Sequence, residues 1–310
     1  MTISFRPAIK SSAKLLVGIY SESGCGKTYS ALLLARGFVG DNGKIAMIET
    51  ESGRGEAYAD TLPGGYSVLS LREDFSPKAY GAAIRAAEEG KFDALIIDSA
   101  SHEWEGINGV LDMAAKNEEA GKKGLLIWQK PKIEHSKEFM LRLMQTSIPL
   151  VIVCMRAKYP MEGHGKDMKR STVLEPKQSA DILFEMMVHG YIDYDHNMHI
   201  TKPRNRAEDK TGIVNSVFED NKPITIETGK RLAKWASGAK SAPPTAPEII
   251  EPFDYDAAGD KMCTATTDHE LRSVFSEAWK RAKNDKEDGM ADTIKAIYNE
   301  QKAKFGDAAK

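Results

Sequence analysis

The sequence has 310 residues, and its 43 Lys and Arg nearly balance 45 Asp and Glu, giving a formal net charge of −2. This length suits one large domain or two ordinary ones, and the charge does not support a strongly basic nucleic-acid binder, although a local basic patch fits within it. The 41% hydrophobic content argues against global disorder, and no apolar run approaches the roughly 20 residues that span a bilayer, so we expect a globular, cytoplasmic protein with no membrane partner.

The first part of the chain alternates short apolar runs with helix-compatible stretches. The apolar runs predict buried strands at residues 15–20, 44–49, 94–98 and 149–154, and the stretches between them predict helices at residues 27–39, 76–89 and 135–145. Two further strands, joined by a turn at residues 195–197, predict an antiparallel extension of the sheet. The spacing predicts an α/β domain over residues 1–236 with a central, mostly parallel sheet.

A glycine-rich loop follows the first predicted strand and leads into a helix. Its glycines allow backbone N–H groups to surround phosphate oxygens, and the helix N-terminus adds its positive end. Lys27 would reach the β and γ phosphates and the Thr28 hydroxyl would bind Mg²⁺, while Ser21 stands where the GxxxxGK[ST] pattern has Gly. The predicted nucleotide-binding residues are Ser21, Glu22, Ser23, Gly24, Cys25, Gly26, Lys27, Thr28 and Tyr29.

Carboxylates at predicted strand ends supply the rest of a triphosphate site. Asp98 closes an apolar strand and is positioned to hold Mg²⁺ through water. A carboxylate that orients the attacking water is expected at a neighbouring strand end, where Glu49 and Glu51 share one face, or at Glu103 just beyond Asp98. The residues alone do not choose among these three.

The order of these motifs resembles that of RecA-like P-loop ATPases. More narrowly, IYSESGCGKT, IETESGRGEAYAD, IIDSASHEWEG and VCMRAK, within residues 3–235, are similar to phage-encoded nucleotide-binding AAA-type proteins, some of which are single-strand annealing recombinases. The resemblance implies a RecA-like core that hydrolyses ATP with Mg²⁺ in the host cytoplasm, with Glu51 as the catalytic glutamate. It also places Cys154 at the position that senses the γ-phosphate, although a thiol is a weak hydrogen-bonding group.

A basic segment follows the predicted strand at residues 149–154. It contains two glycines and five basic residues, which we predict to bind single-stranded DNA: Arg156, Lys158, Lys166, Lys169 and Arg170. In RecA-like proteins the first DNA-binding loop follows this strand, so the resemblance implies the same role. The alternative is a solvated surface loop.

A second basic group, Lys202 and Arg204, ends the predicted antiparallel strands, with Arg206 in reserve. RecA-like oligomers commonly insert such a KxR pair into the ATP site of a neighbouring subunit, where it stabilises charge on the transferring phosphoryl group. The resemblance therefore implies self-assembly into a ring or filament with ATP sites between subunits. The alternative is an exposed basic turn.

The last part of the sequence is separate in composition. Residues 237–253 are rich in proline and predict a linker, and residues 254–310 predict a small acidic domain formed by a helical hairpin. Residues 248–310 carry 10 basic and 14 acidic side chains, a net of −4, which leaves the preceding residues at +2. Such a tail is suited to recruit single-strand-binding or other replication and recombination proteins.

Together these features predict a DNA-stimulated ATPase that binds single-stranded DNA and promotes annealing in phage recombination. An alternative is an ATPase that loads a helicase or switches a replication assembly, with proteins as its main partners. A third is a P-loop small-molecule kinase, but neither an Arg-rich lid nor an acceptor pocket is evident in the sequence.

Overall fold

The computed structural model describes residues 14–163, 168–202, 209–238, 253–284 and 288–307. The chain divides into two compact units, Met1–Ser241 and Ala242–Lys310. The predicted linker at residues 237–253 lies largely outside the described residues. No helix in the described part of the chain is long and apolar enough to cross a membrane.

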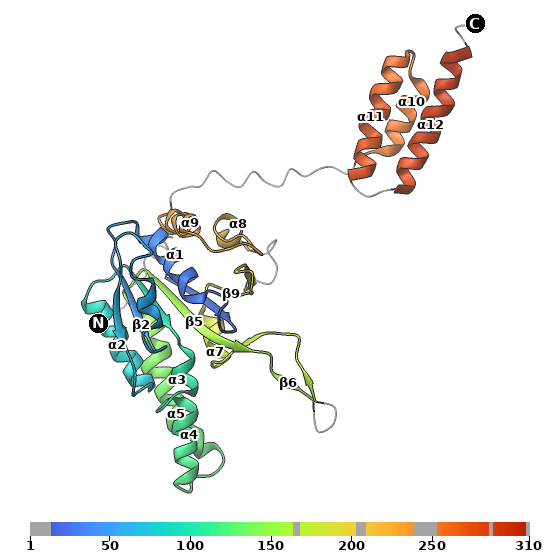
Figure 1. The fold of residues 1–310 in the computed structure, drawn as a ribbon. Coiled ribbons are helices and arrows are strands. Elements are labelled where there is room, and N and C mark those ends of the chain that lie inside the picture. Colours follow the sequence, from blue (N-terminus) through green and yellow to red (C-terminus); the bar gives the residue numbers. More distant parts are fainter. Residues whose placement is uncertain (1–13, 164–167, 203–208, 239–252, 285–287, 308–310) are drawn as a thin grey trace, which may run out of the picture. The chain divides into compact units, whose positions relative to one another are not determined.

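A mostly parallel sheet forms the centre of the first unit, with strand order β10-β9-β1-β5-β4-β2-β3 (Figure 1). All neighbours on this path are parallel except the antiparallel pair β9 and β10. The strands are β1 (Leu15–Ser21), β2 (Ile45–Glu49), β3 (Ser67–Ser70), β4 (Ala94–Asp98), β5 (Leu150–Lys158), β9 (Val188–Ile192) and β10 (Met198–Lys202).

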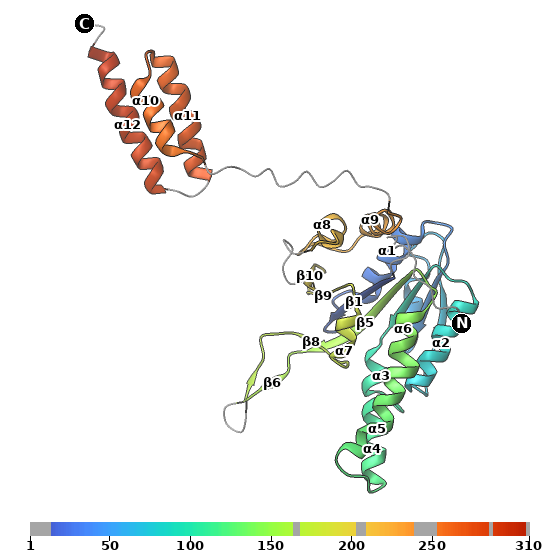
Figure 2. The ribbon, with the colours of Figure 1, turned by 180° about the vertical axis from the view of Figure 1, so that it is seen from behind.

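Three short strands lie off this path. β8 (Glu175–Pro176) pairs antiparallel with the last residues of β5, whereas β6 (Met161–Glu162) and β7 (Lys169–Arg170) pair only with each other. We call β6, β7 and the described residues that connect them to β5 and β8 the ribbon. In Figures 1 and 2 the ribbon projects away from the sheet beyond the end of β5.

Helices cover both faces of the sheet because alternate residues of each strand point to opposite sides. Val17 and Ile19 of β1 face a core shared with α1 and α9, whereas Leu16 and Tyr20 face a core shared with α2, η3 and α6. The helices of this unit are α1 (Lys27–Val39), the 3₁₀ helix η2 (Arg54–Tyr58), α2 (Pro77–Glu89), α3 (Ser101–Glu105), α4 (Val110–Glu119), α5 (Leu125–Glu134), the π-helix η3 (His135–Met140), α6 (Leu141–Gln145), α7 (Asp181–Glu185), α8 (Ile213–Ser216) and α9 (Ile226–Ala236).

Helix α1 is held in place by a close crossing with α9. A Cβ atom at Gly37 would overlap the carbonyl oxygen of Ile226, and one at Gly229 would overlap that of Leu34. Only residues without a side chain allow the two backbones to approach this closely. The crossing fixes the direction of α1, whose N-terminus begins at Lys27.

The α/β fold with a mostly parallel sheet is confirmed, and the predicted strands and helices of the first unit are present. Two differences matter for function. β5 extends to Lys158 rather than ending at Cys154, because residues 157 and 158 pair with β8. The helix predicted at residues 135–145 is the end of a longer helical run that begins at Leu125.

The second unit contains three described helices, α10 (Tyr255–Thr264), α11 (Asp268–Asn284) and α12 (Asp288–Asp307). The predicted hairpin corresponds to α11 and α12, in which the rings of Phe275 and Tyr298 stack 4.2 Å apart. A hairpin alone buries little surface. α10 adds Ala258 and Met262 to its core, which explains why a third helix is needed.

Arg36 is a buried cation that closes the end of α1, with only 1% of its surface exposed. Its guanidinium donates hydrogen bonds to the carbonyl oxygens of Gly40 (2.6 Å), Gly43 (3.0 Å) and Gly65. Arg36→Met would remove the charged donor from all three oxygens and leave only that of Gly40 with a backbone donor, the N–H of Gly43, so we expect the free energy of unfolding to fall by about 3 kcal/mol in urea titrations. The exposed Arg72→Met is the control, and equal stability of the two variants would contradict this account.

Candidate functional site

The loop between β1 and α1 has the backbone of an anion-binding site. Gly24 and Gly26 adopt φ angles of 88° and 90°, in the left-handed region that favours glycine. The N-terminus of α1 has no side-chain cap, so its backbone N–H groups are available to an external acceptor. Lys27 Nζ lies inside the loop, donating to Ser21 Oγ (3.0 Å) and the carbonyl oxygen of Glu22 (3.0 Å). A phosphate can replace these neutral acceptors.

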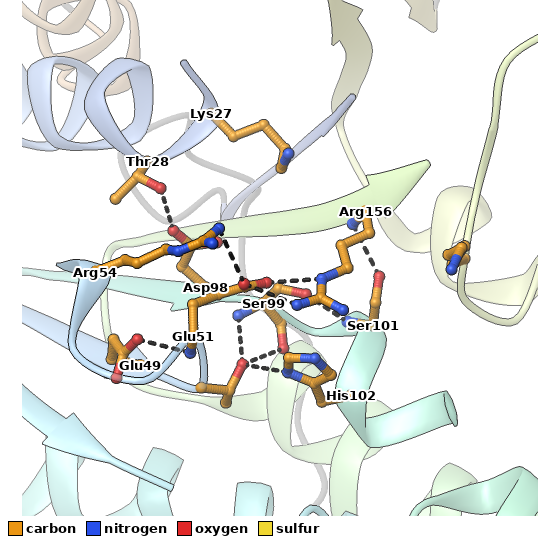
Figure 3. A network of polar contacts seen from close by, with 12 residues as sticks. Lys27, Thr28, Glu49, Glu51, Arg54, Asp98, Ser99, Ser101, His102 and Arg156 are labelled. Carbon is orange, nitrogen blue, oxygen red and sulfur yellow. Dashed lines mark hydrogen bonds and ion pairs between the residues drawn. The ribbon is translucent and has the colours of Figure 1, made fainter. Parts of the chain in front are cut away.

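Thr28 and Asp98 meet at the carboxyl end of β4. Thr28 Oγ1 donates to Asp98 Oδ2 at 2.5 Å (Figure 3). Burial raises the pKa of Asp98, while the hydrogen bond from Thr28 and the charge of Lys27 oppose that rise. A hydroxyl and a carboxylate are oxygen donors of the type that Mg²⁺ prefers, so this pair fits the ion that accompanies a triphosphate.

The residues that follow β2 are anchored so that one carboxylate faces outward. Glu49 is buried, and its Oε1 accepts the backbone N–H of Glu51 at 2.6 Å. The Thr50 hydroxyl accepts the backbone N–H of Ser99 at 2.8 Å, which ties this turn to the end of β4. Glu51 is thereby directed toward the loop that contains Lys27 (Figure 3).

Arg156 of β5 holds the Glu51 carboxylate in a forked pair. Its Nε donates to Oε1 and its Nη2 to Oε2, each at 2.8 Å, and Arg54 Nη1 lies 3.9 Å from Oε2. Burial raises the pKa of Glu51, but the hydrogen bonds and positive charge of Arg156 outweigh burial and leave that pKa below its usual value. The carboxylate is therefore ionised at neutral pH.

The two other candidate glutamates are directed elsewhere. Glu103 is fully buried and accepts hydrogen bonds from His135 Nδ1 (3.0 Å) and Gln178 Nε2 (3.1 Å). Glu49 is buried behind its bond to the Glu51 backbone. Of the three carboxylates, Glu51 lines the cavity described next, so the geometry favours Glu51.

A cavity of about 990 Å³ joins these groups. Its lining contains the polar or charged side chains of Lys27, Thr28, Glu51, Asp98 and Arg156. It also contains Tyr29 and Tyr58, whose rings are stacked with their centres 5.6 Å apart. The cavity-lining residues that sequence reasoning missed are Ser30, Leu33, Arg54, Tyr58, Ala157, Lys177, Asp195, His196, Pro223 and Ile224.

A signal for two of the missed residues was available. Arg54 and Tyr58 lie in η2, directly after the strand end that carries Glu51, so proximity in sequence marks them as neighbours of the site. Lys177 and Pro223 come from distant segments, and nothing local in the sequence marks them.

The turn between β9 and β10 braces the phosphate-binding loop. His196 Nδ1 donates to the carbonyl oxygen of Cys25 at 2.9 Å, and the Tyr194 hydroxyl donates to Glu22 Oε2 at 3.1 Å. Asp193 Oδ1 accepts the backbone N–H of Asn197 at 2.9 Å and closes the turn. The predicted antiparallel pair therefore touches the loop as well as extending the sheet.

Cys154 does not face the cavity. Its side chain is fully buried, and its Sγ lies 4.0 Å from the carbonyl oxygen of Lys27. Burial raises the pKa of this thiol well above its usual value, so it stays neutral. Because β5 continues four residues further than predicted, Arg156 and Ala157 belong to this strand and line the cavity.

The basic residues assigned to DNA fall in different places. Arg156 lies in the cavity, Lys158 is exposed at the end of β5, and Lys166 lies outside the described residues. Lys169 and Arg170 are exposed on β7 of the ribbon. The Arg170 guanidinium lies 4.6 Å from the centre of the Tyr159 ring and 3.5 Å from Glu22 Oε1, so the ribbon contacts the phosphate-binding loop.

Lys202 is engaged within its own chain. Its Nζ donates to the carbonyl oxygens of Phe184 (2.7 Å) and Leu183 (3.4 Å) at the C-terminal end of α7. Arg204 and Arg206 lie outside the described residues. The described geometry therefore gives Lys202 a local role in holding α7.

Comparison with models of protein families identifies a domain in this chain. Residues 13–232 match the family model described as an AAA domain, which covers more than half of the chain and all residues that line the cavity. None of the curated proteins matches the sequence.

Proposed function

Because this chain belongs to the AAA-domain family, we propose that it is an ATPase that hydrolyses Mg²⁺–ATP and couples hydrolysis to binding of single-stranded DNA. One observation carries the ATPase part of the proposal. Lys27, the Thr28–Asp98 pair and Glu51 come from three segments of the chain and line one cavity, at the carboxyl edge of a parallel sheet. This is the set of groups that phosphoryl transfer to water requires.

The residues divide the reaction among themselves. Lys27 leaves its loop acceptors for the phosphates, and the backbone N–H groups at the start of α1 bind phosphate oxygens. Thr28 and Asp98 would hold the Mg²⁺ of the substrate, whose charge offsets that of the phosphates. The aromatic rings of Tyr29 and Tyr58, which line the same cavity, offer a surface for the base.

Glu51 acts on the attacking water. It accepts a proton from that water as the water oxygen forms a bond to the γ-phosphorus. The bond between the γ-phosphorus and the bridging oxygen breaks, and its electron pair leaves with ADP. The proton on Glu51 is then released to solvent or to the inorganic phosphate.

The ribbon is the part of the molecule that supports a DNA partner. The described ribbon together with its attachments to β5 and β8, residues 158–163 and 168–177, carries four basic and two acidic side chains. The ribbon is attached to the cavity at both of its ends. At one end, β5 carries the cavity-lining Arg156, and at the other, the residue after β8 is the cavity-lining Lys177. An exposed, locally basic element attached to a nucleotide site suits phosphate contacts to single-stranded DNA that depend on ATP.

The proposal includes two further properties: the protein assembles into a ring or filament, and it anneals complementary strands during phage recombination. The C-terminal unit would recruit other replication or recombination proteins. Because Lys202 binds carbonyl groups of its own chain, Arg204, with Arg206 in reserve, remains the candidate for a residue that acts in a neighbouring subunit.

The test measures ATP hydrolysis with and without a mixed-sequence single-stranded oligonucleotide at low salt. We expect stimulation, and we expect the double variant Lys169→Ala, Arg170→Ala to weaken DNA binding about tenfold or more and to remove most of the stimulation. Arg272→Ala, which removes an exposed arginine of the second unit, is the matched control.

Three outcomes separate the alternatives. ATP hydrolysis that neither binds nor responds to DNA would contradict the DNA part and favour a helicase loader or assembly switch with protein partners. Binding without faster annealing of complementary strands would contradict the recombination role. Absence of ATP hydrolysis under every condition would contradict the proposal as a whole.

A further inference from the structure

Arg156 connects the cavity, the proposed catalytic glutamate Glu51 and the start of the ribbon. Its backbone is fixed on both sides, because its N–H donates to Ser101 Oγ (2.9 Å) and its carbonyl oxygen accepts from the backbone N–H of Lys177 (2.7 Å). Its side chain is 40% exposed, whereas the side chain of Glu51 is 16% exposed. A change of partner by Arg156 therefore requires motion of its side chain alone.

The forked pair limits what Glu51 can do. Both carboxylate oxygens accept N–H groups from Arg156, and the adjacent positive charge makes the carboxylate a weaker base. A carboxylate held in this way is poorly suited to accept a proton from water. Hydrolysis by Glu51 therefore requires that its pairing with Arg156 be loosened.

A terminal phosphate provides the means to loosen it. Arg156 and Lys27 line the same cavity, and both lie next to Ser21: Arg156 is opposite Ser21 in the β1–β5 register, and Lys27 Nζ donates to Ser21 Oγ at 3.0 Å. Guanidinium binds phosphate and carboxylate with the same forked geometry, and the terminal phosphate of ATP carries more negative charge than one carboxylate. The two anions are therefore competitors for one cation.

We propose that Arg156 exchanges partners between the Glu51 carboxylate and the terminal phosphate of a bound nucleoside triphosphate, so that the third phosphate itself releases the catalytic carboxylate. The inference rests on the proposed ATPase function and adds its regulation. In this scheme Arg156 contacts the terminal phosphate of the substrate and thereby controls whether Glu51 is free to act. A diphosphate lacks the competing group, so Glu51 regains Arg156 once the γ-phosphate has left.

A double-mutant cycle tests the exchange through binding affinity. The unaltered chain and the variants Glu51→Gln, Arg156→Ala and the double variant are titrated with a non-hydrolysable ATP analogue and with ADP. We expect Glu51→Gln to bind the analogue about tenfold more tightly, with little change for ADP, because Arg156 no longer has to leave a charged partner. Arg156→Ala should weaken binding of the analogue by about tenfold and should remove the gain from Glu51→Gln.

The second arm of the cycle separates exchange from simple repulsion. If Glu51 only repels the phosphate, Glu51→Gln should tighten binding of the analogue by the same factor in the unaltered chain and in the Arg156→Ala variant. This result would overturn the inference. Equal effects on ADP and the analogue would overturn it as well. Arg156→Lys, which keeps the charge but loses the fork, provides a second variant and should fall between the unaltered chain and Arg156→Ala.

A matched pair serves as control. Arg272 and Asp268 form an exposed arginine–carboxylate pair at 2.8 Å in the second unit, and neither Arg272→Ala nor Asp268→Asn should change either affinity. If the unaltered chain does not bind the analogue, the proposed ATPase function fails and the inference fails with it. Binding of the analogue without coupling between positions 51 and 156 overturns the inference alone.

Discussion

Lys27→Ala is expected to weaken ATP binding by about 100-fold or more, which corresponds to about 2.7 kcal/mol. Lys27 Nζ lies inside the phosphate-binding loop on neutral oxygens of Ser21 and Glu22, so its charge has no carboxylate partner there. Lys27 can therefore bind a triphosphate without first breaking an ion pair within the loop. Removal of the ammonium group therefore costs the substrate a charge-assisted interaction that water replaces poorly.

Binding is measured by calorimetric titration, with Lys44→Ala as the matched control. Lys44 Nζ also donates to a backbone carbonyl oxygen, that of Gly90 at 3.2 Å, but it lies outside the cavity lining. Lys44→Ala should leave nucleotide affinity unchanged. Because the partners of Lys27 are neutral, Lys27→Ala should change the free energy of unfolding by no more than about 1 kcal/mol. Affinity within threefold of the unaltered chain would show that the phosphates bind elsewhere.

The parts of the site that are local in sequence are the parts that sequence reasoning located. The phosphate-binding loop, the strand before it and the helix after it are consecutive, and Asp98 is marked by the end of an apolar run. Their positions follow from the rule that parallel strands present their carboxyl ends at one edge of the sheet. This rule brings Thr28 to Asp98 without further information.

The parts of the site that depend on residues distant in the chain could not be predicted from the sequence. Glu103 is a structural residue because His135 and Gln178, 32 and 75 positions away, bring hydrogen-bond donors to it inside the core. No local pattern distinguishes such a glutamate from a catalytic one. Arg156 was assigned to a basic loop because the strand was expected to end at Cys154, whereas pairing with β1 and then with β8 continues the strand, and Arg156 lines the cavity.

The C-terminal unit shows the same limit. The apolar faces of α11 and α12 predict two helices that pack together, and this pair is present. The segment that forms α10 has only a weak hydrophobic pattern. It is recognisable only because α11 and α12 together leave apolar surface uncovered. It supplies Met262, which is fully buried in the shared core.

The second large effect is expected at Glu51. Glu51→Gln should lower the turnover number for ATP hydrolysis by about 10²- to 10³-fold, because an amide cannot accept the proton of the attacking water. ATP binding should be retained, since Gln keeps the shape of the side chain and removes a negative charge beside the phosphates. The measurement is release of inorganic phosphate at saturating ATP, together with binding of ATP to the inactive variant.

Glu103→Gln is the matched control because it makes the same chemical change at a glutamate buried near the same sheet edge. Its carboxylate serves His135 and Gln178, so the substitution should lower the free energy of unfolding by about 1 to 3 kcal/mol while turnover stays within about threefold. The two variants therefore separate catalysis from stability. Normal turnover in Glu51→Gln together with lost turnover in a folded Glu103→Gln would exchange the two roles. Loss in both would mean that the buried cluster of Glu103, His135 and Gln178 holds the catalytic geometry as well as the fold.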